Sequence, residues 1–199
     1  MKRQLIVISI ILLFLFPCAG HAGAPLDTVQ ANVNKVLDVL RDPALTAESA
    51  KEAKKARLRP IYDAMFDQVE LSRRTLAMNW NKLNIAQRQE FVQLFRQVLE
   101  KAYVDKILAY TNEKIVYEDE KKLSENQSEV STRVLTASKG IPIAYRMILK
   151  DGVWKVYDVV VENVSLVQNY RTQFNDILVK DTPEQLLEIL RKKVKGQEA

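Results

Sequence analysis

The sequence contains very few of the residues on which much enzyme chemistry depends. It has one cysteine, one histidine and five glycines among 199 residues. Cys18 and His21 both lie in the first 22 residues, which resemble a cleavable export signal. Without them the rest of the chain cannot form a disulfide, a Ser-His-Asp triad, a Cys–His pair or an ordinary zinc site. The few glycines form no phosphate-binding loop and no dinucleotide-binding fingerprint.

The first 22 residues have the three zones of a secretory signal. Lys2 and Arg3 provide a positive start, residues 5–16 are apolar apart from one serine, and Pro17 ends the run. Small residues stand three and one positions before a cut after Ala22. The apolar run, about 12 residues, is shorter than the roughly 20 that span a bilayer. We therefore predict that residues 1–22 are removed and that the protein works outside the cytoplasm.

The sequence allows two other interpretations of residues 1–22. The segment could remain as a membrane anchor, or Cys18 could be lipidated, although Phe16 and Pro17 before it are unlike the small residues of lipoprotein signals. Removing 22 of the 199 residues leaves 177, which we expect to form a single domain, residues 23–199, with a sizeable core. Loss of Lys2 and Arg3 lowers the formal net charge from +5 to +3, and this mild, mixed charge does not suggest nucleic-acid binding.

The patterning predicts helices, then strands, then helices. Apolar residues at spacings of three and four indicate amphipathic helices, and alternation indicates strands. Asn84 with Gln87 and Thr182 with Gln185 form capping boxes, and Asp151-Gly152 is a favoured two-residue hairpin turn. The expected helices span 26–40, 48–58, 61–78, 84–110, 165–178 and 182–195, with a break or restart at Pro60; the expected strands span 114–118, 129–136, 141–150 and 153–161.

Charged side chains offer few candidate sites. Residues 118–120 form the only dense acidic group, which is either a metal or acid–base site or, in the interpretation we favour, a solvated strand end and turn. Asp158 lies within an otherwise apolar strand and is either catalytic or, as we expect, paired with a nearby cation, because buried charges need partners. Arg171 is one candidate partner; alternatively Arg171 and the Arg73–Arg74 pair bind an anionic group.

Large apolar side chains are plentiful on the long helix, on one strand face and on the late helix. They either fill a plain core beneath a curved sheet or line an apolar pocket with a polar mouth, which would be a ligand site. Periodicity does not distinguish these alternatives. From face and size, we expect a lining, if the pocket exists, of Phe91, Phe95, Leu99, Tyr103, Tyr145, Met147, Val164 and Phe174.

Two blocks of the sequence resemble the MlaC family, also called the toluene-tolerance family. The first runs from residues 66–67 to Trp80 and on through 87–96 to Tyr103; the second covers 154–166 and then 169–174. Together they span nearly all of the chain after the signal, in the expected order and spacing. The stretch 76–80 departs from the family, which often has a glycine where this chain reads Leu-Ala-Met-Asn-Trp.

The resemblance implies an α+β fold: a curved four-stranded antiparallel sheet wrapped by N- and C-terminal helices, enclosing an apolar lipid cavity. It further implies a monomeric periplasmic phospholipid carrier with no catalytic residues, metal or cofactor. Such carriers shuttle lipid between an outer-membrane lipoprotein–porin complex and an inner-membrane ABC transporter that bears an MCE-domain ring, which maintains outer-membrane lipid asymmetry. A periplasmic chaperone or carrier of acylated polypeptides is the alternative, and a hydrolase built on carboxylates alone is a more distant one.

Overall fold

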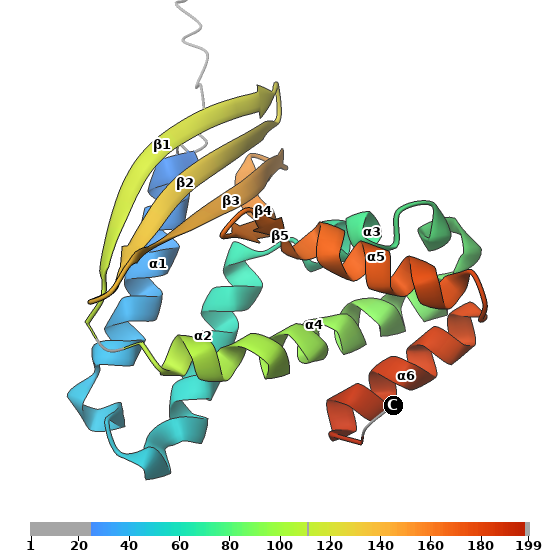
Figure 1. Ribbon diagram of the computed structural model, residues 1–199, viewed down its shortest axis with the longest axis horizontal. Helices are drawn as coiled ribbons and strands as arrows, with labels where there is room; N and C mark the ends of the chain where they lie inside the picture. Colours follow the sequence, from blue (N-terminus) through green and yellow to red (C-terminus); the bar gives the residue numbers. More distant parts are fainter. Residues whose placement is uncertain (1–24, 111, 198–199) are drawn as a thin grey trace, which may run out of the picture.

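The computed structural model describes residues 25–110 and 112–197, so the expected signal with Cys18 and His21 lies outside the described residues. Within them the chain forms an antiparallel sheet with helices on either side of it in sequence (Figure 1). The helices are α1 (Pro25–Arg41), α2 (Lys51–Met65), α3 (Gln68–Leu76), α4 (Ile85–Leu108), α5 (Leu166–Leu178) and α6 (Pro183–Lys195), with short 3-10 turns η1 (Pro43–Leu45), η2 (Glu48–Ala50) and η3 (Ala77–Lys82). No helix among the described residues has the length and apolar character needed to cross a membrane.

The sheet is a meander in which each strand pairs with the next. Its strands are β1 (Lys114–Ser124), β2 (Gln127–Leu135), β3 (Gly140–Lys150), β4 (Val153–Val161) and β5 (Val164–Ser165), paired in the order β1-β2-β3-β4-β5. The α+β fold with a curved antiparallel sheet is confirmed, with a fifth strand added to the expected four. The added strand, β5, has only two residues. Glu162 and Asn163 before it have positive φ values of 48° and 68°, so the chain reverses tightly and β5 pairs with the end of β4.

Local signals in the sequence are confirmed at several helix and strand ends. The two capping boxes begin α4 and α6, with Asn84 Oδ1 accepting from the Gln87 amide at 2.9 Å and Thr182 Oγ1 accepting from the Gln185 amide at 3.3 Å. The Asp151-Gly152 turn joins β3 to β4, and both residues have positive φ, as this hairpin type requires.

The expected helices around Pro60 are placed wrongly. Helix α2 runs through Pro60 without ending, and the break comes later, at Phe66 and Asp67. There Phe66 forms a parallel bridge with Val156 of β4, and the Asp67 amide donates to the Val156 carbonyl at 2.9 Å. The Asp67 carboxylate then caps α3 by accepting from the Glu70 amide at 2.9 Å. Pairing with a distant strand therefore ends the helix, a cause that local sequence does not reveal.

The first strand is longer than expected and contains the acidic group. Residues 118–120 are exposed and lie inside β1, so their solvation is confirmed but their place in a turn is wrong. The strand bulges between Tyr117 and Asp119. Charged side chains and a bulge suit β1 because it is an edge strand, whose unpaired backbone would otherwise invite pairing with another chain.

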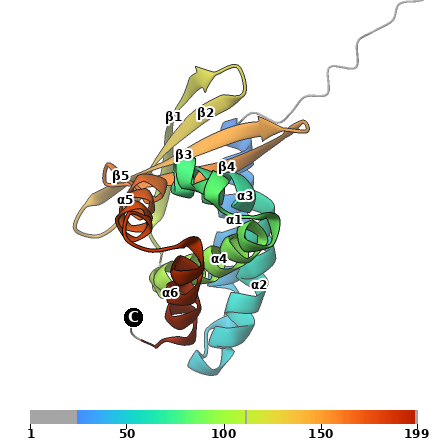
Figure 2. The ribbon, with the colours of Figure 1, turned by 90° about the vertical axis from the view of Figure 1, so that its right-hand side faces the viewer.

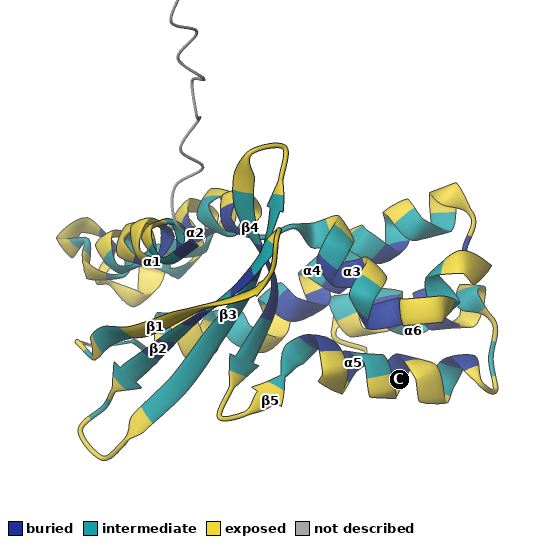
Figure 3. Ribbon diagram, turned by 90° about the horizontal axis from the view of Figure 1, so that it is seen from above, coloured by how far each residue is buried: buried dark blue, intermediate teal, exposed yellow. Residues whose placement is uncertain are grey.

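The helices divide into two groups around the sheet (Figures 1 and 2). Helix α1 packs against β1 and β2 and α2 packs on α1, whereas α3 and α5 meet the sheet at β4, and α6 packs along α4. Two hydrophobic cores result. The sheet core is formed by Val29, Val33, Met65, Val130, Met147 and Val156. The helical core is formed by buried residues of α3, α4, α5 and α6 together with Leu83. In the helical half, buried stretches of α3, α4 and α6 face inward, while much of the sheet is only partly buried (Figure 3).

Candidate functional site

The helical core contains most of the side chains expected to line a pocket. Phe91 and Phe95 of α4 are fully buried, and each meets Phe174 of α5 edge to face, at ring-centroid distances of 5.6 Å and 5.3 Å. Leu99 is buried beside them and Tyr103 packs against the same cluster. These rings fill the helical core, and their contacts are those of a packed interior.

The sheet core contains two further expected side chains, Tyr145 and Met147 of β3. Met147 is fully buried and Tyr145 is partly buried, and both lie on the face that packs against Val29 and Val33 of α1. Val164, the remaining candidate, is 59% exposed on β5 and lies in neither core. The structure therefore divides the eight expected residues between two cores and the surface.

Phe66 links the two cores. Its ring packs against the buried residues of both, and it stacks on Tyr62 of α2 at a centroid distance of 4.5 Å. Phe66 is not among the eight residues expected to line the pocket. Its position in the α2–α3 break, which depends on the bridge to Val156, could not be read from periodicity.

The apolar face of the sheet extends well beyond its buried centre. The antiparallel register places Ile143 opposite Val161 and Tyr145 opposite Val159, so these four side chains share one face. Val161 is 38% exposed and the other three are partly buried. Further partly buried members of this face are Ile115, Tyr117, Val134, Leu149 and Trp154. The alternation of residues 141–150 identified this face, but not how much of it the helices leave uncovered.

The phenols on this face, like free tyrosines, are neutral near pH 7, and burial makes them harder to ionise. Desolvation raises the pKa of Tyr145 to about 12, and it also raises the pKa of Tyr117. Their hydroxyls therefore keep their protons near neutral pH and remain hydrogen-bond donors. A neutral, mostly apolar surface with a few hydroxyl groups is suited to an uncharged ligand segment rather than to an anion.

Ion pairs connect the two halves between α2 and α4. Arg59 pairs with Glu100 at 2.7 Å, and Arg96 binds Asp63 through two hydrogen bonds of 2.8 Å and 2.9 Å. These groups are partly exposed, and ion pairs in contact with water contribute little to stability. The α2–α4 contact is therefore weaker than the packing inside either core.

Asp158 pairs with a nearby cation, as expected, but its partner is Arg146 and not the candidate Arg171. Asp158 is 2% exposed; its carboxylate accepts from Ser165 Oγ at 2.6 Å and the Val167 amide at 3.0 Å, and lies 3.3 Å from Arg146 Nη1. Arg171 instead donates to the Arg74 carbonyl at 2.7 Å and 3.0 Å. The strand register decides this, because Arg146 is the cross-strand partner of Asp158.

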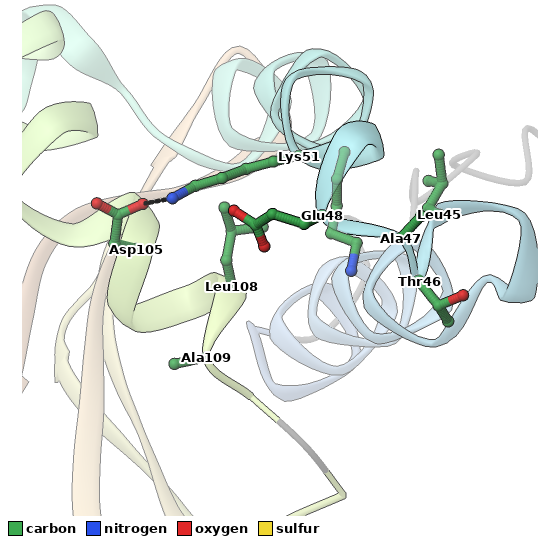
Figure 4. A pocket seen from close by; sticks show the side chains of 9 residues that line it. Leu45, Thr46, Ala47, Glu48, Lys51, Asp105, Leu108 and Ala109 are labelled. Carbon is green, nitrogen blue, oxygen red and sulfur yellow. Dashed lines mark ion pairs between the residues drawn. The ribbon is translucent and has the colours of Figure 1, made fainter.

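A pocket of about 280 Å³ lies elsewhere, where η1, η2 and the start of α2 meet the end of α4 (Figure 4). It includes Lys51, whose ammonium group pairs with Asp105 at 3.1 Å, along with Glu48 and Lys54. None of the eight expected residues lines it. It is slightly smaller than the roughly 300–1,000 Å³ of typical ligand sites, and its charged lining differs from the expected apolar cavity. Among the described residues no cluster of acidic, histidine or cysteine side chains could hold a metal ion.

Comparison with known proteins defines the class to which this fold belongs. Residues 30–192 match the MlaC protein family, and the chain belongs to that family. It is similar to the toluene tolerance protein ttg2D of Pseudomonas putida, with 26% identity over 183 residues, covering 86% of this chain and 81% of that protein. Its fold is similar to that of a phospholipid-binding protein from Ralstonia solanacearum, solved in complex with a phospholipid. That likeness has a TM-score of 0.77 at 19% identity and covers 87% of this chain and 98% of the other.

Proposed function

We propose that this protein is a periplasmic phospholipid carrier that binds the acyl tails between its two cores and leaves the head group outside. It would be exported by residues 1–22 and work as a monomeric domain of residues 23–199, without a metal or cofactor. It would carry lipid between an outer-membrane lipoprotein–porin complex and an inner-membrane MCE-domain ABC transporter, and so maintain outer-membrane lipid asymmetry. Membership of the MlaC family and the phospholipid bound by the Ralstonia relative support this proposal.

The observation that carries the proposal is the broad, partly buried apolar face of the sheet. Ile143, Tyr145, Val159 and Val161 extend this face past the buried centre of the sheet core. The aromatic helical core forms a second apolar mass, joined to the sheet core by Phe66. Parting two apolar surfaces around acyl tails exposes little of either to water, because the tails replace the contacts that are lost.

The free-energy cost of exposing acyl tails to water requires an apolar binding site. A two-tailed phospholipid has roughly 30 methylenes, each worth about 0.8 kcal/mol on leaving water, so its tails cost over 20 kcal/mol to expose. A carrier must therefore offer an interior nearly as apolar as the bilayer, but not a much better one, because release would then be slow. In this arrangement Tyr145 and Met147 line the sheet side of the tails. Phe91, Phe95, Leu99, Tyr103 and Phe174 line the helical side, and Val164 lies at the rim.

Extraction of the purified protein tests the ligand class. The protein is isolated from the periplasm, extracted with organic solvent and examined by mass spectrometry; a second sample, stripped of lipid, is incubated with liposomes. We expect phospholipid in both. If neither sample contains phospholipid the carrier function is refuted, and an acylated peptide in the first extract would favour the alternative carrier of acylated polypeptides.

A matched pair of variants tests the location of the tails. Ile143→Glu places a carboxylate on the partly buried apolar face, whereas Val153→Glu makes the same change at a site that is 50% exposed beside the β3–β4 turn. We expect Ile143→Glu to reduce the lipid load at least tenfold, because a buried carboxylate is strongly disfavoured, and Val153→Glu to leave it unchanged. Circular dichroism verifies that both variants are folded. An unchanged lipid load in folded Ile143→Glu would exclude this face as the tail site.

A further inference from the structure

Two buried side-chain atoms of the described residues have no hydrogen-bond partner, Gln68 Nε2 and Tyr117 Oη. The Gln68 amide still uses its oxygen, which accepts from Tyr62 Oη at 3.4 Å. The Tyr117 hydroxyl makes no hydrogen bond, although it can donate one, can accept others and is free to rotate. No suitably placed group of residues 25–110 or 112–197 is therefore available to it. Buried polar groups in native proteins are nearly always paired, so an unpaired one indicates a missing partner such as a water or a ligand.

Tyr117 lies within the apolar face that we assign to the acyl tails. It belongs to β1, opposite Thr132 of β2, which in turn is opposite Ile143 of β3. Its ring packs against the sheet core together with Tyr145. The bulge that follows Tyr117 shifts the register of β1 at this point, and bulges commonly redirect a side chain near a functional site.

The hydroxyl of Thr132, the cross-strand neighbour of Tyr117, already has a partner. Thr132 Oγ1 donates to the Ile143 carbonyl at 3.0 Å. On this part of the apolar face the threonine hydroxyl is therefore bonded, whereas the buried Tyr117 phenol is not. A phenylalanine would fill the place of Tyr117 without burying an unpaired hydroxyl.

We propose that Tyr117 Oη donates a hydrogen bond to an acyl ester carbonyl of the bound phospholipid, so that the protein selects ester-linked over ether-linked lipids. The inference rests on the proposed function. Acyl tails offer no acceptor, and a phosphate would bring its charge into an apolar site where the unpaired donor is a neutral phenol. The ester carbonyl is the neutral acceptor attached directly to the tails, which makes it the group that suits this donor.

Competition between two lipids tests the inference. Lipid-free protein is incubated with vesicles that contain equal amounts of a diacyl phosphatidylcholine and a dialkyl ether phosphatidylcholine of the same chain length, and the bound lipids are quantified by mass spectrometry. We expect the unaltered protein to favour the diacyl lipid about 2- to 10-fold, the range of a single neutral hydrogen bond. Tyr117→Phe should bring this ratio close to one and retain most of the total lipid load. Tyr157→Phe is the matched control, because Tyr157 belongs to neither core and its hydroxyl donates to Gln127 Oε1 at 3.1 Å; it should keep the preference.

The possible outcomes separate this inference from the proposed function. Lipid uptake without a preference for the diacyl lipid, or a preference that survives in Tyr117→Phe, overturns the inference alone. Uptake of neither lipid overturns both. Thermal melting of the lipid-free proteins adds an independent readout: Tyr117→Phe should melt no lower than the unaltered protein, because no hydrogen bond is lost, whereas Tyr157→Phe, which loses its bond to Gln127, should melt lower. A lower melting temperature for Tyr117→Phe would show that its hydroxyl already has a partner, such as a bound water, and would refute the inference.

Discussion

Phe66 provides a direct test of how the two halves of the molecule are coupled. Its ring packs against both cores, while α2 and α4 are joined by partly exposed ion pairs. Replacing a fully buried phenylalanine by alanine costs about 3–5 kcal/mol, and for the partly buried Phe66 we expect about 2 kcal/mol. With a urea dependence of about 2 kcal/mol per molar, the unfolding midpoint should fall by about 1 M.

The two tryptophans report on the two halves separately. Trp80 packs against the helical core and Trp154 against the sheet core, and the chain has no other tryptophan. Fluorescence of Trp154→Phe therefore follows the helical half, and fluorescence of Trp80→Phe follows the sheet half. In the lipid-free protein we expect the two urea transitions to coincide, as in a cooperative two-state protein, and to separate once Phe66→Ala is added.

Val33→Ala is the matched control, because Val33 is buried in the sheet core and does not belong to the helical core. It should shift both transitions together, since Phe66 still couples the halves. Bound phospholipid should bring the separated midpoints of Phe66→Ala closer again if the tails lie between the cores. Coincident transitions in lipid-free Phe66→Ala would refute the reasoning and show that the two cores unfold as one without this side chain.

Two further predictions concern backbone strain and high pH. Ala77 has φ 49° and ψ −125°, a conformation that favours glycine, so Ala77→Gly should raise the unfolding free energy by about 1 kcal/mol in urea titration; a decrease would contradict the strain. Burial raises the pKa of Tyr145 to about 12, above the value of about 10 in an unfolded chain, so its stabilising contribution is complete below pH 10 and is lost as the pH rises to 12. Between pH 10 and pH 12 the unfolding free energy of Tyr145→Phe should therefore fall by about 2–3 kcal/mol less than that of the unaltered protein. Parallel plots of unfolding free energy against pH for the two proteins would contradict the raised pKa.

The strain at Ala77 gives physical meaning to the one departure from the family pattern. The family often has glycine in the stretch 76–80, and this chain adopts a glycine-like conformation there without a glycine. Exposed Met78 follows directly, within η3. The backbone of this chain therefore adopts the conformation although the residue best suited to it is absent.

Local signals determined much of this fold because their causes lie within a few residues. The capping boxes at Asn84 and Thr182, the Asp151-Gly152 turn and the alternating face of β3 all follow from near neighbours, and the structure confirms them. Only tertiary contacts decided the rest. The helix break at Phe66 depends on Val156, about ninety residues away. Periodicity predicts the face on which a side chain lies, but it does not predict which element packs against that face. For the same reason the sequence could nominate large apolar residues for one pocket, whereas packing divided them between two cores joined by Phe66.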